Sequence, residues 1–148
     1  MTAPSTVHAS AVMAGEVGIL IRGPSGAGKS HLAFDLILAG RSGRIPATVL
    51  VGDDRVLLSV ADGRLAVRPA AELGGLLEIR GLGVRRLDFV PQADVRLVVD
   101  LAAGDFARLP EPASLMTPID GIKIPRIPVG AGFDALRLVT AALLTRPI

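Results

Sequence analysis

The 148-residue sequence contains no cysteine, no tryptophan and no tyrosine, and only 3% of its residues are aromatic. Without cysteine, the chain has no disulfides, no thiolate metal site and no cysteine nucleophile. The scarcity of aromatic rings argues against the stacking platform that single-stranded nucleic acid requires. Hydrophobic residues make up 50% of the sequence, so its core must be built mainly from aliphatic side chains.

The charge of the chain is nearly balanced, with a formal net charge of +2 at pH 7 despite a pI of 9.9. Few groups titrate between about pH 8 and 10, so a small surplus of arginine is enough to raise the pI. The arginines are scattered rather than gathered in blocks, and we expect no nucleic-acid partner. No apolar run approaches the length of a membrane span, and the N-terminus lacks the basic region of an export signal. We therefore expect no membrane association and a cytoplasmic location.

The hydrophobic pattern predicts an α/β fold with a mixed sheet and few helices, in one compact domain over residues 1–148. Helices are expected at residues 30–39 and 134–144, and a hairpin turn at residues 62–63. Strands are expected at residues 6–13, 17–21, 48–51, 56–60, 64–67, 78–80 and 96–101.

Three further segments carry specific expectations. The helix at 30–39 is apolar on almost every side, which predicts an interior position against a sheet. Residues 102–118 are rich in proline and are expected to form a loop. Residues 122–129 also contain proline and are expected to form an edge segment of the sheet.

Residues 23–30 read G-P-S-G-A-G-K-S and match the phosphate-binding pattern G-x-x-x-x-G-K-[ST]. Glycines allow backbone N–H groups to turn toward phosphate oxygens, and the helix that follows directs its positive end at them. Lys29 is expected to reach the terminal phosphates, and Ser30 to offer its hydroxyl to Mg²⁺. The pattern predicts a nucleotide site formed by Gly23, Pro24, Ser25, Gly26, Ala27, Gly28, Lys29 and Ser30.

A phosphate-binding loop needs a carboxylate near the metal, and a kinase also needs a base. Two strand ends compete for these roles: Asp53 and Asp54 follow one apolar run, and Asp100 follows another. Adjacent strand residues face opposite sides, so only one of the paired aspartates can face the loop directly. A polar turn is the alternative interpretation of that pair.

Glu78 and Arg80 flank one apolar residue and precede a glycine-containing turn at residues 81–83. This spacing allows both side chains to project from one strand face. A carboxylate that binds a metal would then lie beside a guanidinium that stabilises phosphate. A salt-bridged surface pair is the alternative.

Together these segments resemble the catalytic domain of HPr kinase/phosphorylase, a bacterial protein kinase unrelated to the eukaryotic kinase fold. The resemblance spans essentially the whole chain. A histidine-containing strand comes first, followed by the 23–30 loop, the strand end V-L-V-G-D-D-R and then E-I-R-G-L-G. The last segment resembles the family's own signature and is the most specific of the four.

The resemblance implies ATP-dependent phosphorylation of a serine on HPr, the small phosphocarrier protein of the phosphotransferase system. By position, His8 and Lys29 would be active-site residues. Asp54, or failing that Asp53, would be the base in the forward direction and the acid in reverse. The resemblance also implies a homo-oligomer, and the sequence leaves open whether this is a hexamer or a smaller assembly.

The remaining roles also come from the resemblance. Ser30 and Glu78 would hold Mg²⁺, and Arg80 with the 81–83 turn would position the transferred phosphoryl group. Arg108 resembles a family arginine that lies upstream of the last strand.

The sequence departs from the family pattern in three places. It has no counterpart of the additional N-terminal domain that family members often carry, and it reads His-Ala at residues 8–9 where His-Gly is usual. Where the family tends to have an arginine-bearing loop tied to dephosphorylation, residues 129–134 read V-G-A-G-F-D. We therefore predict kinase activity with weak or absent phosphorylase activity.

Two rival functions remain open at this point. In a small-molecule kinase or general P-loop NTPase, Asp100 would be the metal-linked carboxylate, and residues 78–83 would have no assigned role. In a regulatory module that senses ATP, the chain would bind nucleotide without transferring phosphate. The presence of Lys29, Ser30, Asp54 and Glu78 argues against such a module.

Overall fold

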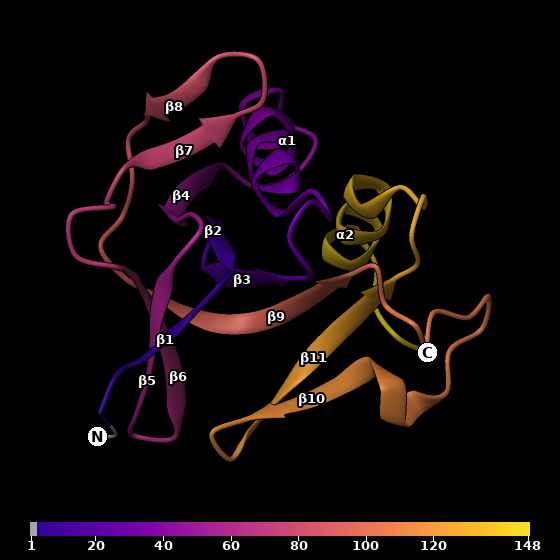
Figure 1. The fold of residues 1–148 in the computed structure, drawn as a ribbon. Coiled ribbons are helices and arrows are strands. Elements are labelled where there is room, and N and C mark those ends of the chain that lie inside the picture. Colours follow the sequence, from indigo (N-terminus) through magenta and orange to yellow (C-terminus); the bar gives the residue numbers. More distant parts are fainter. Residues whose placement is uncertain (1–2) are drawn as a thin grey trace.

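The computed structural model describes residues 3–148, and these form a mixed sheet with two helices packed on one face (Figure 1). The helices are α1 (Lys29–Arg41) and α2 (Ala135–Leu144), and a 3₁₀ turn, η1, covers Pro112–Leu115. Within the described chain the sheet contains nine strands: β1 (Ser5–Val7), β2 (Ser10–Ala14), β3 (Val17–Arg22), β4 (Thr48–Gly52), β5 (Val56–Ala61), β6 (Arg64–Pro69), β9 (Ala93–Leu101), β10 (Met116–Ile119) and β11 (Ile122–Val129). A separate hairpin pairs β7 (Leu76–Ile79) with β8 (Gly83–Arg86).

The long strand β9 organises the sheet. Along its length β9 pairs in parallel with β3, which leads into the 23–30 loop. On its other side, β9 pairs first with β6, in antiparallel fashion, and then with β11, in parallel. Figure 1 shows the sheet dividing at this strand, with the β5–β6 pair and the β10–β11 pair diverging from it. The carboxyl ends of β3, β9 and β11 therefore meet at one edge, the usual place for a ligand in such sheets.

Four details differ from the sequence-based expectations. The strand expected at residues 6–13 is broken at His8–Ala9, because β1 pairs with β5 whereas β2 pairs with β3 and β4. Arg80, expected at the end of a strand over residues 78–80, lies in the turn after β7. The segment expected to be a loop at 102–118 contains η1 and most of β10. Helix α1, at Lys29–Arg41, begins one residue before the expected helix at 30–39 and ends two residues after it. The expected turn at residues 62–63 is confirmed, since it joins β5 to β6.

Strand β11 explains how a proline-containing segment enters the sheet. Its first half, residues 122–125, pairs with β10, and its second half, residues 126–129, pairs with β9. In these registers, each half of β11 pairs with a neighbouring strand on one side only. Proline lacks a backbone N–H donor, and a strand that is paired on one side only can accommodate this loss. Pro125 and Pro128 are therefore tolerated. β11 is not the outermost strand that was expected, yet each half has the one-sided pairing of an edge strand.

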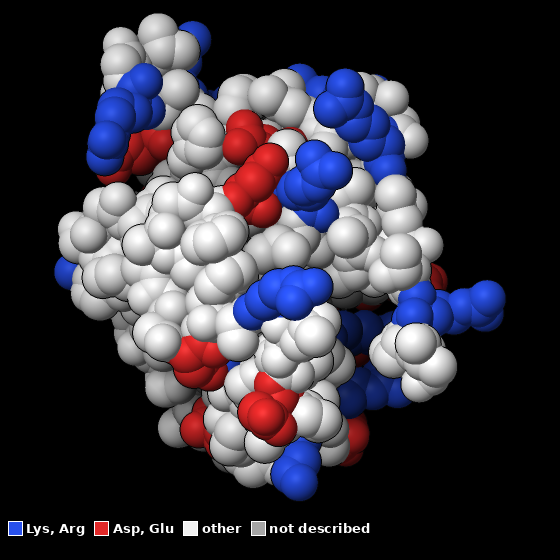
Figure 2. All heavy atoms as spheres, turned by 90° about the vertical axis from the view of Figure 1, so that its right-hand side faces the viewer, with Lys and Arg blue, Asp and Glu red and all other residues white. Residues whose placement is uncertain are grey.

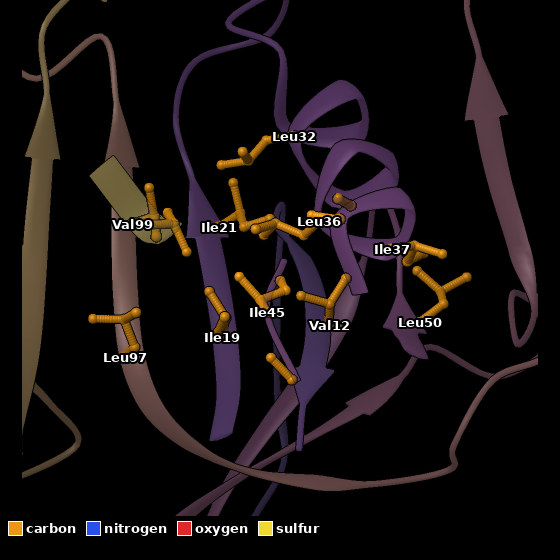
Figure 3. Packing of buried hydrophobic residues seen from close by; sticks show 14 of the residues in the cluster. Val12, Ile19, Ile21, Leu32, Leu36, Ile37, Ile45, Leu50, Leu97 and Val99 are labelled. Carbon is orange, nitrogen blue, oxygen red and sulfur yellow. The ribbon is translucent and has the colours of Figure 1, made fainter. Parts of the chain in front are cut away.

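Alternating side chains of the central strands build a core on each face of the sheet. Ile19 and Ile21 point toward α1, whereas Leu20 between them belongs to the cluster on the opposite face. Figure 3 shows Leu32, Leu36 and Ile37 of α1 packed over these strands. The core is aliphatic, as the composition predicts. It holds β3 and α1 in a fixed relation, and the 23–30 loop connects them.

Helix α1 is less enclosed than its sequence predicts. Its buried side faces β2, β3 and β4, and β7 and α2 contact it as well. Leu38, however, is 44% exposed. The apolar outer side of α1 is therefore not fully covered within the described chain.

Charged side chains of both signs are mixed on one face of the molecule. On the face shown in Figure 2, lysines and arginines lie in several separate groups with aspartates and glutamates between them. No single basic stripe crosses this face. Among residues 3–148, no helix is long and apolar enough to cross a membrane.

Candidate functional site

The 23–30 loop has the backbone geometry of an anion-binding loop. Gly26 and Gly28 have φ angles of 81° and 99°, in the left-handed region that favours glycine, and a Cβ added at either would meet nothing within 4 Å. Gly28 is the N-cap of α1, so the first N–H groups of the helix, which have no partner within the helix, face the loop. The Lys29 ammonium donates to the carbonyl oxygens of Gly23 (2.8 Å) and Pro24 (3.2 Å), which places its charge across the loop. The loop therefore fits a chain of phosphates.

Asp53 is the carboxylate that faces this loop. It is only 5% exposed, and it accepts hydrogen bonds from the Ser30 hydroxyl at 2.7 and 2.9 Å. The Ser10 hydroxyl, on β2, donates to it at 2.6 Å, and the backbone N–H of Glu78 at 3.2 Å. One aspartate after β4 thus connects the phosphate-binding loop, the sheet and the β7–β8 hairpin. The sequence predicted that only one member of the pair would do so.

Asp54 points into an open cavity instead. It is exposed and has a φ of 67°, a left-handed conformation that is uncommon for residues other than glycine. It borders a cavity of about 700 Å³, which we call the Asp54 cavity. The cavity is lined by Ser10, Ser25, Gly26, Gly28, Lys29, Ser30, His31, Phe34, Asp35, Leu38, Asp54, Glu78, Ile79 and Arg80. The exposed Asp54 carboxylate therefore borders the same cavity as Lys29.

The β7–β8 hairpin brings Glu78 and Arg80 to the same cavity. Figure 1 shows the hairpin beside α1, and the hydrogen bond from the Glu78 backbone N–H to Asp53 ties the hairpin to this site. Both side chains line the Asp54 cavity, and no ion pair joins them in the part of the chain that the structure describes. The surface ion pair considered from the sequence is therefore not formed.

The residues of the Asp54 cavity fit a magnesium–phosphate group better than a metal held by protein alone. Within residues 3–148, no cluster of three or more His, Asp or Glu side chains could hold a metal ion. Mg²⁺ is commonly bound by one or two protein ligands together with substrate phosphates and water. The Ser30 hydroxyl and the Glu78 carboxylate, which border the same cavity as Lys29, supply such a partial set of oxygen donors.

Two predicted active-site residues lie outside this cavity. His8 is an exposed residue in the bend between β1 and β2, two residues before Ser10. Arg108 is exposed in the segment between β9 and η1. Neither is among the residues that border the Asp54 cavity, so the structure does not bring them together with Lys29 and Asp54. Their roles remain predictions.

Asp100, the rival metal ligand, is already held by two guanidinium groups. Arg22 donates to its two carboxylate oxygens at 2.7 and 2.9 Å, and Arg126 donates to it as well. Burial alone would raise the pKa of Asp100, but the hydrogen bonds and charges of both arginines outweigh it and lower the pKa. Because both of its oxygens accept from arginine, Asp100 is not available to a metal. It instead anchors Arg22, the residue directly before the phosphate-binding loop.

A second cavity lies on the other side of the phosphate-binding loop, at the carboxyl ends of β9 and β11. It has a volume of about 570 Å³, and we call it the Phe133 cavity. Leu101 and Val129 border it from the two strands, and Phe133 borders it from the loop before α2. The sequence contains no signal for this cavity, because its walls come from three segments that are far apart along the chain.

The loop, its aspartates and the hairpin can be compared with known proteins. The HPr Serine kinase C-terminal domain family matches residues 1–146. The chain belongs to this family. Curated relatives named HPr kinase/phosphorylase include one from Geobacillus thermodenitrificans, 35% identical over 96% of this chain, and one from Neisseria meningitidis serogroup B, 30% identical over 97% of it. The chain covers 48% and 47% of these two relatives, so it spans about half of their length.

A solved structure supports the fold of this family member. The Hpr(Ser) kinase/phosphatase from Coxiella burnetii matches with a TM-score of 0.74 and 25% sequence identity, over 93% of this chain and 87% of the other. The mixed α/β P-loop fold predicted from the sequence is thereby confirmed.

One residue of the site carried no signal in the sequence. Ser10 is fully buried and donates to Asp53 from the middle of the sheet. In an Ala-Ser-Ala context it resembles a small core residue, and only its position opposite β4 reveals the contact. In this chain the Ser10 hydroxyl holds the Asp53 carboxylate in place.

Proposed function

We propose that this chain is the catalytic part of an ATP-dependent kinase that phosphorylates a serine of an HPr-type phosphocarrier protein. The observation that supports this most directly is the contact between Ser30 and buried Asp53, with Asp54, Glu78 and Arg80 bordering the same cavity as Lys29. A P-loop NTPase needs the contact between Ser30 and Asp53, whereas a kinase also needs an exposed carboxylate such as Asp54. Family membership and the printed names of the relatives favour the same activity and acceptor.

In this proposal the phosphate-binding loop positions ATP. Its backbone N–H groups and the Lys29 ammonium bind the phosphates, and the positive end of α1 adds to their field. Ser30 and Glu78 would hold Mg²⁺, which supplies positive charge beside the phosphate oxygens when it is bound. Asp53 keeps the Ser30 hydroxyl oriented through its short hydrogen bonds. Arg80 would bind the phosphoryl group during transfer.

Asp54 is the proposed base, because it is exposed to the cavity whereas Asp53 is enclosed by donors. The acceptor serine oxygen forms the new bond to the γ-phosphorus, and its proton passes to the Asp54 carboxylate. The bond from that phosphorus to the bridging oxygen breaks, and ADP leaves. Catalysis is then mainly a matter of position and electrostatics.

A phosphotransfer assay tests the proposal. The chain is incubated with ATP labelled at the γ-phosphate, Mg²⁺ and an HPr-type carrier from the same genome, and label on a carrier serine is measured. Transfer is expected, and it should become much slower when Asp54 is replaced. Bound ATP without label on the carrier, in a single-turnover experiment, would favour the rival regulatory module.

Glu78 gives a prediction about the metal. Glu78→Gln should raise the Mg²⁺ concentration needed for half-maximal transfer by at least about tenfold, since changes around metal sites commonly weaken metal binding by 10- to 100-fold. Titrating Mg²⁺ at saturating ATP measures this. Glu72→Gln is the matched control, because Glu72 is exposed and does not border the cavity. An unchanged Mg²⁺ requirement in the Glu78 variant would remove Glu78 from the metal site.

The loop before α2 gives a prediction about the reverse reaction. Residues 130–134 border the Phe133 cavity, and neither Lys nor Arg is among the residues that line it. Where an arginine stabilises a transferred phosphoryl group, it accelerates transfer by about 10³- to 10⁵-fold. Release of phosphate from a seryl-phosphorylated carrier should therefore be slower than forward transfer by on the order of 10²-fold or more. Comparable rates in the two directions would contradict this.

A further inference from the structure

We propose that the Phe133 cavity binds the nucleoside part of the nucleotide, with its base stacked on the ring of Phe133. This proposal rests on the proposed use of ATP and deepens it. The two cavities share residues Ser25, Gly26 and Gly28 of the phosphate-binding loop. A nucleoside triphosphate that follows the loop from one cavity therefore reaches the other.

Charge determines which end of the nucleotide enters which cavity. Both cavities are bordered by carboxylates, and Asp35 borders both of them. Only the Asp54 cavity is also bordered by cationic side chains, Lys29 and Arg80, which attract phosphate. The Phe133 cavity is bordered by Asp35 and Asp134 and by neither Lys nor Arg. Carboxylates repel phosphate but accept hydrogen bonds from ribose hydroxyls and base amino groups. The uncharged part of the nucleotide therefore belongs in the Phe133 cavity.

The chemistry of the walls fits a flat aromatic ligand. Leu101 and Val129 provide apolar surface at the ends of β9 and β11, where ligands bind in sheets of this kind. Phe133 is 59% exposed, in a protein with four phenylalanines and no tryptophan or tyrosine. An aromatic side chain so exposed beside a phosphate-binding loop provides a face on which a base can stack.

The Phe133 ring is held in position before any ligand binds. Phe106 packs against it with ring centroids 4.1 Å apart and an interplanar angle of 33°. Both rings lie over Gly130, where an added Cβ would come within 2.9 Å of Phe106 and 3.0 Å of Phe133. Ala103 donates its backbone N–H to the Val129 carbonyl at 2.9 Å, which joins the two segments. A ring held in this way loses little freedom on binding.

Binding measurements with two ligands isolate the stacking contribution. Phe133→Ala should weaken ATP binding by about 5- to 100-fold, the range expected for loss of one stacked base. Inorganic tripolyphosphate carries the phosphates without a nucleoside, and its affinity should change by less than about twofold. Phe133→Tyr, which keeps the ring, should restore ATP binding. Equal losses for both ligands, or no loss for ATP, would overturn the proposal.

Fluorescence gives a second, independent readout. Because the chain has no tryptophan, Phe133→Trp introduces a single reporter in the cavity. ATP should quench its emission and tripolyphosphate should not. Leu144→Trp is the control, since Leu144 is 63% exposed and lies at the far end of α2, roughly 13 Å along the helix axis from Ala135. Bound ATP without quenching at position 133 would overturn the stacking. Failure of both ligands to bind the unsubstituted chain would instead overturn the proposed function.

Discussion

Replacing Asp54 with asparagine is expected to lower the rate of serine phosphorylation by about 10²- to 10⁴-fold, the usual contribution of a general base. Affinity for ATP should remain within about twofold, because the phosphates are bound by the loop and by Lys29. Asparagine suits this test because, like aspartate, it tolerates the left-handed backbone conformation that Asp54 adopts, with a φ of 67°.

The measurement is single-turnover transfer of labelled phosphate at saturating ATP, together with ATP binding on the same samples. Asp62→Asn is a matched control, because Asp62 is also exposed and has a φ of 54° in the β5–β6 turn, away from the cavity. If the Asp54 variant transferred phosphate at the unsubstituted rate, Asp54 would not be the base. A comparison with Asp53→Asn, which removes the acceptor of the Ser30 hydroxyl, would then decide whether Asp53 takes that role.

Replacing Arg126 with methionine is expected to destabilise the fold by about 2–4 kcal/mol, close to the cost of breaking a buried ion pair. The Arg126 side chain is 13% exposed and contacts Asp100, which is 16% exposed. Arg22 remains paired with Asp100 in the variant, so the cost should not exceed this range. Arg126 also donates to the Ser114 carbonyl at 2.8 Å and to Asp105 at 2.7 Å, and these contacts attach the segment after β9 to the sheet.

Chemical denaturation of the variant checks this value. Arg64→Met is the control, since Arg64 is 72% exposed and lies 3.6 Å from Asp94, a geometry that contributes at most about 1 kcal/mol. Equal effects of the Arg126 and Arg64 substitutions would contradict the partial burial of the Arg126–Asp100 pair.

The same network predicts how stability depends on pH. The folded state lowers the pKa of Asp100, so its contribution is present above the unfolded pKa of about 3.9 and is lost as the pH falls below it. In the Arg126 variant this acid-dependent loss should be smaller, since one of the two groups that lower the pKa is gone. Denaturation at several acidic pH values distinguishes the two proteins.

Local patterns in the sequence were sufficient for both helices, for most of the strands and for the 23–30 loop, but not for β8, β10 or η1. The G-P-S-G-A-G-K-S segment acts through its own backbone and the helix that follows it, so its geometry depends little on distant residues. The alternation of strand residues and the Asp62-Gly63 turn predicted the β5–β6 hairpin for the same reason. Strand order was not predictable, because pairing depends on which distant segments meet.

The roles of the acidic residues depended on both levels. The sequence placed Asp53 and Asp54 after one strand and Asp100 after another, and it indicated that only one of the first two could face the loop. The fold decided the rest: Ser10 and Ser30 surround Asp53, the cavity receives Asp54, and Arg22 and Arg126 occupy Asp100. Such contacts join residues up to 78 positions apart, as between Arg22 and Asp100.

By itself, then, the sequence determined the aliphatic core, the two helices, most of the strands and a loop able to bind phosphate, because these follow from the order of neighbouring side chains. Only the tertiary structure decided that Asp53 is the carboxylate that contacts the loop and that Asp100 is paired with arginine. It also decided that Phe133 borders a cavity beside the 23–30 loop. The physical reason is that burial and charge pairing depend on the three-dimensional neighbours of a residue, which its neighbours along the chain do not specify.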